Sequence, residues 1–373
     1  MKVAVLGANG QVGTELCLLL AQQPDLTVIP ICRNRMGSAY LRSQGLGCRH
    51  GQSSDPSQAA KLYGDCGIVV NLALLNELRD PPRARRENHQ LIRNVAECLG
   101  EHGRHLYFST MSVYGDVEVG QRWVVRHPYG RRKLESEKIA RRYGRRFGCP
   151  TYVFRLGHVC GELQNITREI RSAIQAGPIL LPDPDRASNT VYVATIVDAI
   201  LKAGTGAIAP GVYDLMNVPQ WSWREVLAYE AGSAGVSVEL EHVPDARPKG
   251  IGEIARCVLA LGISSAARSG FLNRVVSRIL PTLPIAWYRR LRAAYAIQSA
   301  GREIAELKHC RPMLQAVFRK PVGNRFPVML APTADLLRDP IFRLARGVSR
   351  HPWPEDLPLH AVCIQGPPFG RQS

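Results

Sequence analysis

The sequence predicts an α/β protein with a doubly wound parallel sheet and a smaller, mainly helical C-terminal subdomain. Residues 2–6 (KVAVL) form an apolar strand-like run, and a glycine-rich turn and an apolar helical pattern follow it directly. A second such run, IVVNLA, occupies residues 68–73, and a third ends at Thr110. A chain of 373 residues, of which 45% are hydrophobic, can bury the core that such a sheet needs.

The glycine-rich turn is the first candidate functional element. A strand, a glycine turn and a helix together are the context of a dinucleotide-binding fingerprint, in which amides at the helix N-terminus meet a pyrophosphate. The spacing here is G-x-x-G-x-x-G, and an ordinary tight turn is the alternative. We expect a Rossmann-type cofactor site built from Gly7, Asn9, Gly10, Gln11, Val12 and Gly13.

The end of the second strand bears on the choice of cofactor. An acidic residue about 20 positions after the glycines binds the ribose 2′-hydroxyl of NAD. The sequence TVIPICRNR instead offers Cys32, Arg33 and Arg35 and no acid. Because a guanidinium suits a 2′-phosphate, Arg33 favours NADP over NAD. The alternative is that Arg33 is a solvated loop charge.

Thr110, Tyr129 and Lys133 form the candidate catalytic group. Tyr129 and Lys133 are four residues apart, which places them on one face of a helix. A tyrosine has a pKa of about 10, and a neighbouring cation lowers it. The phenol can then exchange a proton with a carbinol while a cofactor moves the hydride. A chance match in an ordinary helix is the alternative.

Together with the glycine turn, these residues resemble an extended short-chain dehydrogenase/reductase of the NAD-dependent epimerase/dehydratase family. The resemblance covers residues 1–245 and includes, in order, IVVNLA, a helix opened by Asn88, RLGHVCG at 155–161 and NTVYVATIVDAI at 189–200. It implies that Thr110 orients the substrate, that Tyr129 is the general acid/base, and that Lys133 lowers the tyrosine pKa and holds the nicotinamide ribose. It also implies cofactor contacts at Asn71, Ala73 and Ser109, and substrate contacts at Met111, Ser112, His158 and Asn165.

The chain departs from the family pattern at three places. Met111 and Ser112 stand where the dehydratase branch has an Asp-Glu pair, which argues against a sugar 4,6-dehydratase because no acid and base are supplied for water elimination. His158 replaces a common asparagine and is either a polar contact or a hydrogen-bonded structural histidine. Asp55 either replaces an aspartate near the adenine or opens the next helix.

The net charge of +17 arises from two basic segments, because the remaining residues together carry −2. Residues 122–146 have ten Lys or Arg and two Glu, and the expected explanation is a solvated helix face, with an anion-attracting face beside the active site as the alternative. Residues 254–330 have thirteen Lys or Arg and two Glu among aromatic and aliphatic residues. This stretch fits a lid or packing subdomain, or a helix at an anionic membrane surface. It carries no recognised nucleic-acid motif, so nucleic acid is not an expected partner.

These observations predict three regions: a Rossmann domain with interleaved substrate segments at 1–245, a basic helical subdomain at 246–351, and a Pro/Gly-rich tail at 352–373. The ten cysteines include no C-x-x-C pair, so neither a metal site nor a disulfide framework is expected. A reducing cytoplasm is the expected location. The first strand begins at Lys2, so no N-terminal signal is expected.

The expected function is NAD(P)-dependent oxidoreduction or epimerisation at a hydroxyl or keto carbon of a sugar or nucleotide-sugar. The substrate class comes from the family resemblance alone. One alternative is a ketoreductase or hydroxy dehydrogenase of a lipidic substrate at a membrane surface. Another is a non-catalytic protein that senses NADPH. The resemblance also allows a homodimer.

Overall fold

The structure is a computed structural model, and it describes most of the first 242 residues. The described residues are 1–75, 81–114, 117–119, 123–125, 128–181, 183–217, 220–242 and 328–329. The predicted basic subdomain at 246–351, apart from 328–329, and the predicted tail at 352–373 lie outside the described residues.

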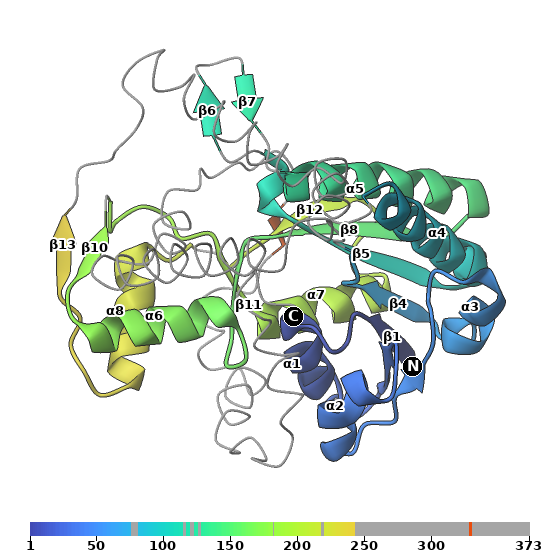
Figure 1. Cartoon of the computed structure of the whole chain (residues 1–373), viewed down its shortest axis with the longest axis horizontal. Helices are drawn as coiled ribbons and strands as arrows, with labels where there is room; N and C mark the ends of the chain where they lie inside the picture. The colour runs from blue at the N-terminus through green and yellow to red at the C-terminus, as the bar shows by residue number, and fades with distance from the viewer. Residues whose placement is uncertain are drawn as a thin grey trace, which may run out of the picture.

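An eight-stranded parallel sheet organises the molecule (Figure 1). Its order is β14-β12-β8-β5-β4-β1-β2-β3, so the chain builds outward from β1 in one direction and from β4 in the other. This reversal between β1 and β4 is the switch point of a doubly wound sheet, which confirms the predicted fold. The strands are β1 (Lys2–Leu6), β2 (Thr27–Cys32), β3 (Arg49–His50), β4 (Ile68–Asn71), β5 (Arg104–Thr110), β8 (Thr151–Leu156), β12 (Val212–Leu215) and β14 (Val328–Met329).

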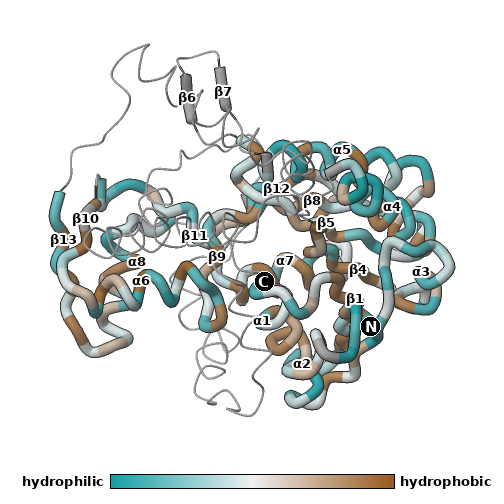
Figure 2. The backbone as a smooth tube through the Cα atoms, in the orientation of Figure 1, coloured by the Kyte–Doolittle hydropathy of each residue, from teal (hydrophilic) through white to brown (hydrophobic). Residues whose placement is uncertain are grey.

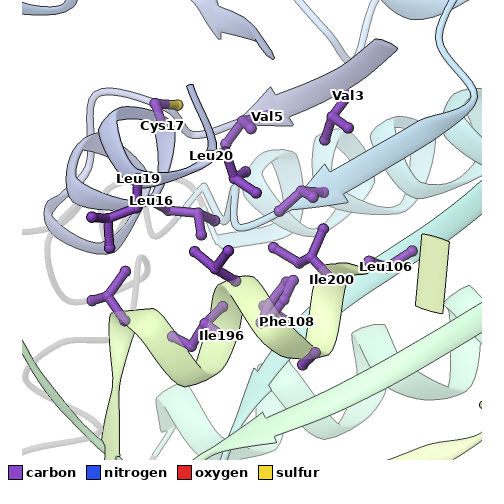
Figure 3. Packing of buried hydrophobic residues seen from close by; sticks show 14 of the residues in the cluster. Val3, Val5, Leu16, Cys17, Leu19, Leu20, Leu106, Phe108, Ile196 and Ile200 are labelled. Carbon is purple, nitrogen blue, oxygen red and sulfur yellow. The ribbon is translucent and has the colours of Figure 1, made fainter. Parts of the chain in front are cut away.

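Helices cover both faces of the sheet. They are α1 (Gln11–Leu20), α2 (Ala39–Ser43), α3 (Pro56–Tyr63), α4 (Pro81–Leu99), α5 (Pro128–Phe147) and α7 (Val193–Thr205), with short 3-10 turns η1 (Met36–Ser38), η2 (Gly100–His102) and η3 (Met111–Tyr114). Alternate strand residues point to opposite faces. Val3, Val5, Leu106 and Phe108 therefore pack with α1 and α7 (Figure 3), while Ala4, Leu6 and Val69 pack with α3 and α4. Apolar residues gather on the strands and α7, and α4 and α5 carry polar outer surfaces (Figure 2).

A smaller layer follows β8. It contains α6 (Asn165–Ala176), α8 (Trp223–Ser233) and two short parallel strand pairs, and its own apolar cluster includes Ile170 and Trp223. The pairs are β9 (His158–Cys160) with β11 (Thr190–Tyr192), and β10 (Ile179–Leu181) with β13 (Leu240–His242). A further antiparallel pair joins β6 (Val117–Val119) and β7 (Trp123–Val125). Ser222 caps α8 through a capping box with Glu225.

Two expectations about helix starts are decided by the fold. Asn88 does not open a helix, because α4 already begins at Pro81 and Asn88 lies inside it. Asp55 does open the next helix, since its side chain accepts a hydrogen bond from the Ser57 amide at the start of α3. Across the described ranges, none of the helices has an apolar stretch sufficient to cross a bilayer.

Candidate active site

The glycine turn is held against the end of β4. Gly7 has φ +77°, and a side chain there would place its Cβ 3.1 Å from the Ala73 amide nitrogen. At Gly13 a Cβ would lie 2.2 Å from the Gly7 carbonyl oxygen. Gly10 closes the turn by donating its amide to the Gly7 carbonyl at 3.0 Å. The predicted glycines and Ala73 therefore form one compact turn at the carboxyl ends of β1 and β4.

Helix α1 begins directly after the glycine turn, and no side chain caps its N-terminus. Gly10 is the N-cap residue and has no side chain to cap the first amides, so the amides of Gln11, Val12 and Gly13 begin the helix. Uncapped amides and the positive end of the helix dipole are what a pyrophosphate requires. On the other side of this helix end, the Gln164 side chain donates to the Gln11 carbonyl at 3.2 Å, and Asn165 follows as the first residue of α6.

The loop after β2 carries cationic residues. Arg33 directly follows the strand and is exposed. Arg42 donates to the Ser38 hydroxyl at 3.0 Å and to the Arg35 carbonyl at 3.2 Å, which fixes the loop. A Cβ on Gly37 would lie 2.9 Å from the side-chain nitrogen Nδ2 of Asn9, so this loop also abuts the glycine turn. Arg33 thus lies on a loop that contacts the glycine turn.

Thr110 ends β5 at the same edge of the sheet as the glycine turn. Its hydroxyl oxygen accepts a hydrogen bond from the Ser112 amide at 3.2 Å. A hydroxyl that accepts in this way keeps its own proton to donate elsewhere. The first turn of α5 packs closely here, since a Cβ on Gly130 would lie 2.4 Å from the Ser112 carbonyl oxygen. Tyr129, one residue earlier, therefore lies in the turn of α5 that packs on η3, the turn that follows Thr110.

Lys133 is buried, and its ammonium points to the end of β5. It donates to the Phe108 carbonyl at 2.8 Å and lies 5.1 Å from the centre of the Tyr107 ring. Burial lowers the pKa of Lys133 to about 8, although Glu137 opposes the shift. Burial also raises the pKa of Tyr129, opposite to the direction that the sequence predicts. The protein alone thus holds Tyr129 as a neutral phenol, which is the form that can donate a proton.

A buried ion pair that is not among the residues predicted from the sequence supports this helix. The guanidinium of Arg155 binds Glu137 with its closest contact at 2.6 Å, and the Ser109 hydroxyl donates to the same carboxylate at 2.5 Å. The side chains of Arg155 and Glu137 are 7% and 0% exposed. Ser109, which the resemblance predicts as a cofactor contact, is thus tied to Glu137 through its hydroxyl. Glu137 is four residues after Lys133, so its position on the Tyr129–Lys133 face was a usable signal.

The network continues to the next strand. Arg155 donates to the Tyr114 hydroxyl at 3.0 Å, and that hydroxyl donates to the fully buried Asp214 at 2.8 Å. Tyr114 is the last residue of η3, two residues after Ser112, while Asp214 lies on β12. The chain of contacts therefore fixes the turn after Thr110 to two strands of the sheet.

Three further residues named in the sequence analysis, Asn71, His158 and Asn88, make contacts within the protein. Asn71 is fully buried, and its side-chain nitrogen lies 3.4 Å from His105 Nε2, so its side chain faces the interior. His158 packs its ring 5.7 Å from that of the buried Trp223, which fits the structural alternative for this histidine. Asn88 holds the segment after β4, because its amide group both accepts from and donates to the backbone of Leu75.

Comparison with known proteins finds a family and individual proteins whose sequences are similar to this chain. A family model described as the NAD dependent epimerase/dehydratase family matches residues 3–215. A UDP-2-acetamido-2,6-beta-L-arabino-hexul-4-ose reductase of Pseudomonas aeruginosa is 25% identical over 228 residues, which are 59% of this chain and 54% of that protein. An uncharacterised UDP-glucose epimerase of Bacillus subtilis is 25% identical over 226 residues, 54% of this chain and 71% of that protein. This chain thus matches about half the length of the first relative.

Solved structures share the fold. A UDP-glucuronic acid 4-epimerase from Bacillus cereus, in complex with NAD, has a TM-score of 0.51 and 19% identity, covering 65% of this chain and 87% of that one. A UDP-N-acetylglucosamine 4-epimerase from the same species has a TM-score of 0.50 and 17% identity, covering 65% and 85%. At these identities the likeness concerns the fold.

Proposed function

Because the chain belongs to the NAD-dependent epimerase/dehydratase family over residues 3–215, we propose that it is an NAD(P)-dependent oxidoreductase or epimerase of a nucleotide sugar. The observation that carries the proposal is the convergence of three parts at one edge of the sheet. These parts are the uncapped helix after the glycine turn, Thr110 at the end of β5, and Lys133 directed at the Phe108 carbonyl. The carboxyl edge of a parallel sheet, next to its switch point, is where such folds bind ligands.

In the proposed mechanism Tyr129 donates or accepts the proton of the reacting oxygen. Thr110 orients that oxygen by donating the hydroxyl proton that its bond with Ser112 leaves available. A bound nicotinamide would supply hydride transfer at the adjacent carbon. Lys133 carries a positive charge below pH about 8, and this charge stabilises the phenolate that Tyr129 becomes after donating its proton.

Replacing Tyr129 tests this role. Tyr129→Phe removes the proton donor, so we expect kcat to fall about 100-fold or more, with NAD(P)H affinity unchanged. The measurement is turnover on a panel of nucleotide-linked keto and hydroxy sugars. Tyr143→Phe is the matched control, because it makes the same change further along α5, where the ring stacks on Phe147. Full turnover by Tyr129→Phe would refute the mechanism.

We propose NADP rather than NAD as the preferred cofactor, on account of Arg33 and the absence of an acid after β2. Arg33→Ser should weaken NADPH binding about tenfold and leave NADH binding within about twofold, since only NADPH carries the 2′-phosphate. Fluorescence titration of the nucleotide-free protein measures both affinities, with the exposed Arg145 replaced in the same way as the control. An equal loss for both nucleotides would contradict this preference.

The nucleotide that the purified protein retains separates the two reaction types. Denaturation followed by mass spectrometry of the released nucleotide is the measurement. Tightly retained NAD would indicate an epimerase that recycles its own hydride and would overturn the interpretation of Arg33. A nucleotide-free protein that prefers NADPH would indicate a reductase that exchanges its cofactor at each turnover.

A further inference from the structure

A pocket between α4 and α5 has no role in the proposed reaction. It has a volume of about 410 Å³, within the range of small-ligand sites. Neither Thr110, Tyr129 nor Lys133 is among the described residues that line it. Arg132, which does line it, is the residue before Lys133 on α5.

The lining of the pocket is rich in guanidinium groups. Arg85 and Arg86 reach it from α4, and Arg132 reaches it from α5. One carboxylate, that of Glu135, also lines it, but this group is already bound by Arg85 at 2.6 Å and lies 3.4 Å from His89. Arg85 and Glu135 thus neutralise one another, and the charges of Arg86 and Arg132 remain.

Arg132 is a partly buried cation whose charge the described residues do not balance. Its Nε atom is buried and has no hydrogen-bond partner among the described residues. Burial and the neighbouring Arg131 lower its pKa. No ion pair within the described ranges involves Arg86 either. A buried donor without a partner is costly, so an anion in the pocket would remove an existing penalty.

The chemistry of these groups selects the ligand. Guanidinium forks bind phosphate oxygens in pairs and favour a doubly charged anion where two cations are unbalanced. The volume exceeds what a single phosphate needs, and Pro82 adds an apolar surface. We propose that this pocket binds a phosphate-bearing small molecule, with Arg86 and Arg132 holding the phosphate. This assigns a specific site within the basic α5 segment, whose charge otherwise fits a solvated face.

Isothermal titration of the full chain with inorganic phosphate and with pyrophosphate tests the proposal. Saturating NADPH is present throughout, so that the glycine turn and Arg33 are occupied. The Arg86→Gln/Arg132→Gln variant should bind either probe at least about tenfold more weakly than wild type. The matched control is Arg142→Gln/Arg145→Gln, which removes the same charge from exposed positions of α5 and should stay within about twofold.

A variant with the opposite expected effect guards against a folding artefact. Glu135→Gln frees Arg85 and adds a positive charge to the pocket, so phosphate affinity should rise severalfold. The single variant Arg86→Gln, at an exposed position, should weaken binding while keeping the thermal unfolding midpoint of wild type. Equal losses in the pocket and control variants, or no phosphate or pyrophosphate binding by the NADPH-saturated wild type, would overturn the proposal.

Discussion

At the scale of single residues, Glu137 belongs to a charged run of the sequence, but its side chain is buried and forms an ion pair. It accepts a hydrogen bond from the Ser109 hydroxyl and pairs with the Arg155 guanidinium. It lies on α5, the helix that contains Tyr129 and Lys133. A buried pair of this kind need not stabilise the fold compared with an apolar pair, but removing one partner leaves an uncompensated charge. We therefore regard Glu137 as the residue that holds α5 in place on β5 and β8.

Glu137→Gln should lower the free energy of unfolding by about 3–5 kcal/mol, because it leaves Arg155 buried and unpaired. Urea denaturation measures the change. Glu135→Gln makes the same replacement two residues earlier, where the carboxylate forms a partly exposed pair with Arg85, and should cost less than about 1 kcal/mol. Similar unfolding curves for the two variants would show that the buried pair has no such role.

At the scale of elements, the glycine turn joins β1, α1 and β4 through contacts that only glycine permits. The close approach at Gly13 is backbone against backbone, with 2.2 Å between a would-be Cβ and the Gly7 oxygen, so a flexible side chain cannot move aside. The start of α1 and the path of the turn are therefore set together, and any shift there moves the uncapped amides.

Gly13→Ala should force the first turn of α1 away from Gly7 and weaken NAD(P)H binding about tenfold or more, with a loss of stability of about 1–3 kcal/mol. Nucleotide titration and thermal unfolding measure the two effects. Gly47→Ala is the matched control, because a Cβ at Gly47 would meet nothing within 4 Å. Unchanged nucleotide affinity in Gly13→Ala would separate the turn from the cofactor site.

At the scale of the whole molecule, Glu15 connects α1 to the smaller layer that contains α6 and α8. Its carboxylate on α1 accepts hydrogen bonds from the amides of Glu162 and Leu163 at 3.0 Å and from the Gln164 side chain at 2.7 Å. A Cβ on Gly161 would lie 2.3 Å from this carboxylate, so the loop needs glycine to approach it. Burial raises the pKa of Glu15 to about 7, against the lowering effect of these hydrogen bonds.

This pKa predicts how stability depends on pH. The folded protein binds the Glu15 proton more tightly than the unfolded chain does. The stabilisation that this proton gives is therefore fully present below the ordinary glutamate pKa of 4.5 and is lost as the pH rises through about 7. The unfolding free energy of wild type should therefore fall relative to that of Glu15→Gln across this window, on the order of 3 kcal/mol. Urea denaturation at a series of pH values measures it; parallel pH profiles would contradict the prediction.

The sequence by itself determined the first strand with its glycine turn and following helix, the strand that ends at Thr110, and the helix of Tyr129 and Lys133. These features depend on local periodicity and on spacings of a few residues. Only the tertiary structure decided that Ser109 binds Glu137, that Asn88 lies within α4, and that burial raises the Tyr129 pKa. It alone showed the Tyr114–Asp214 contact, which joins residues 100 positions apart, and the arginine pocket between two helices. Burial and pairing of this kind arise when distant elements pack together, so no local pattern encodes them.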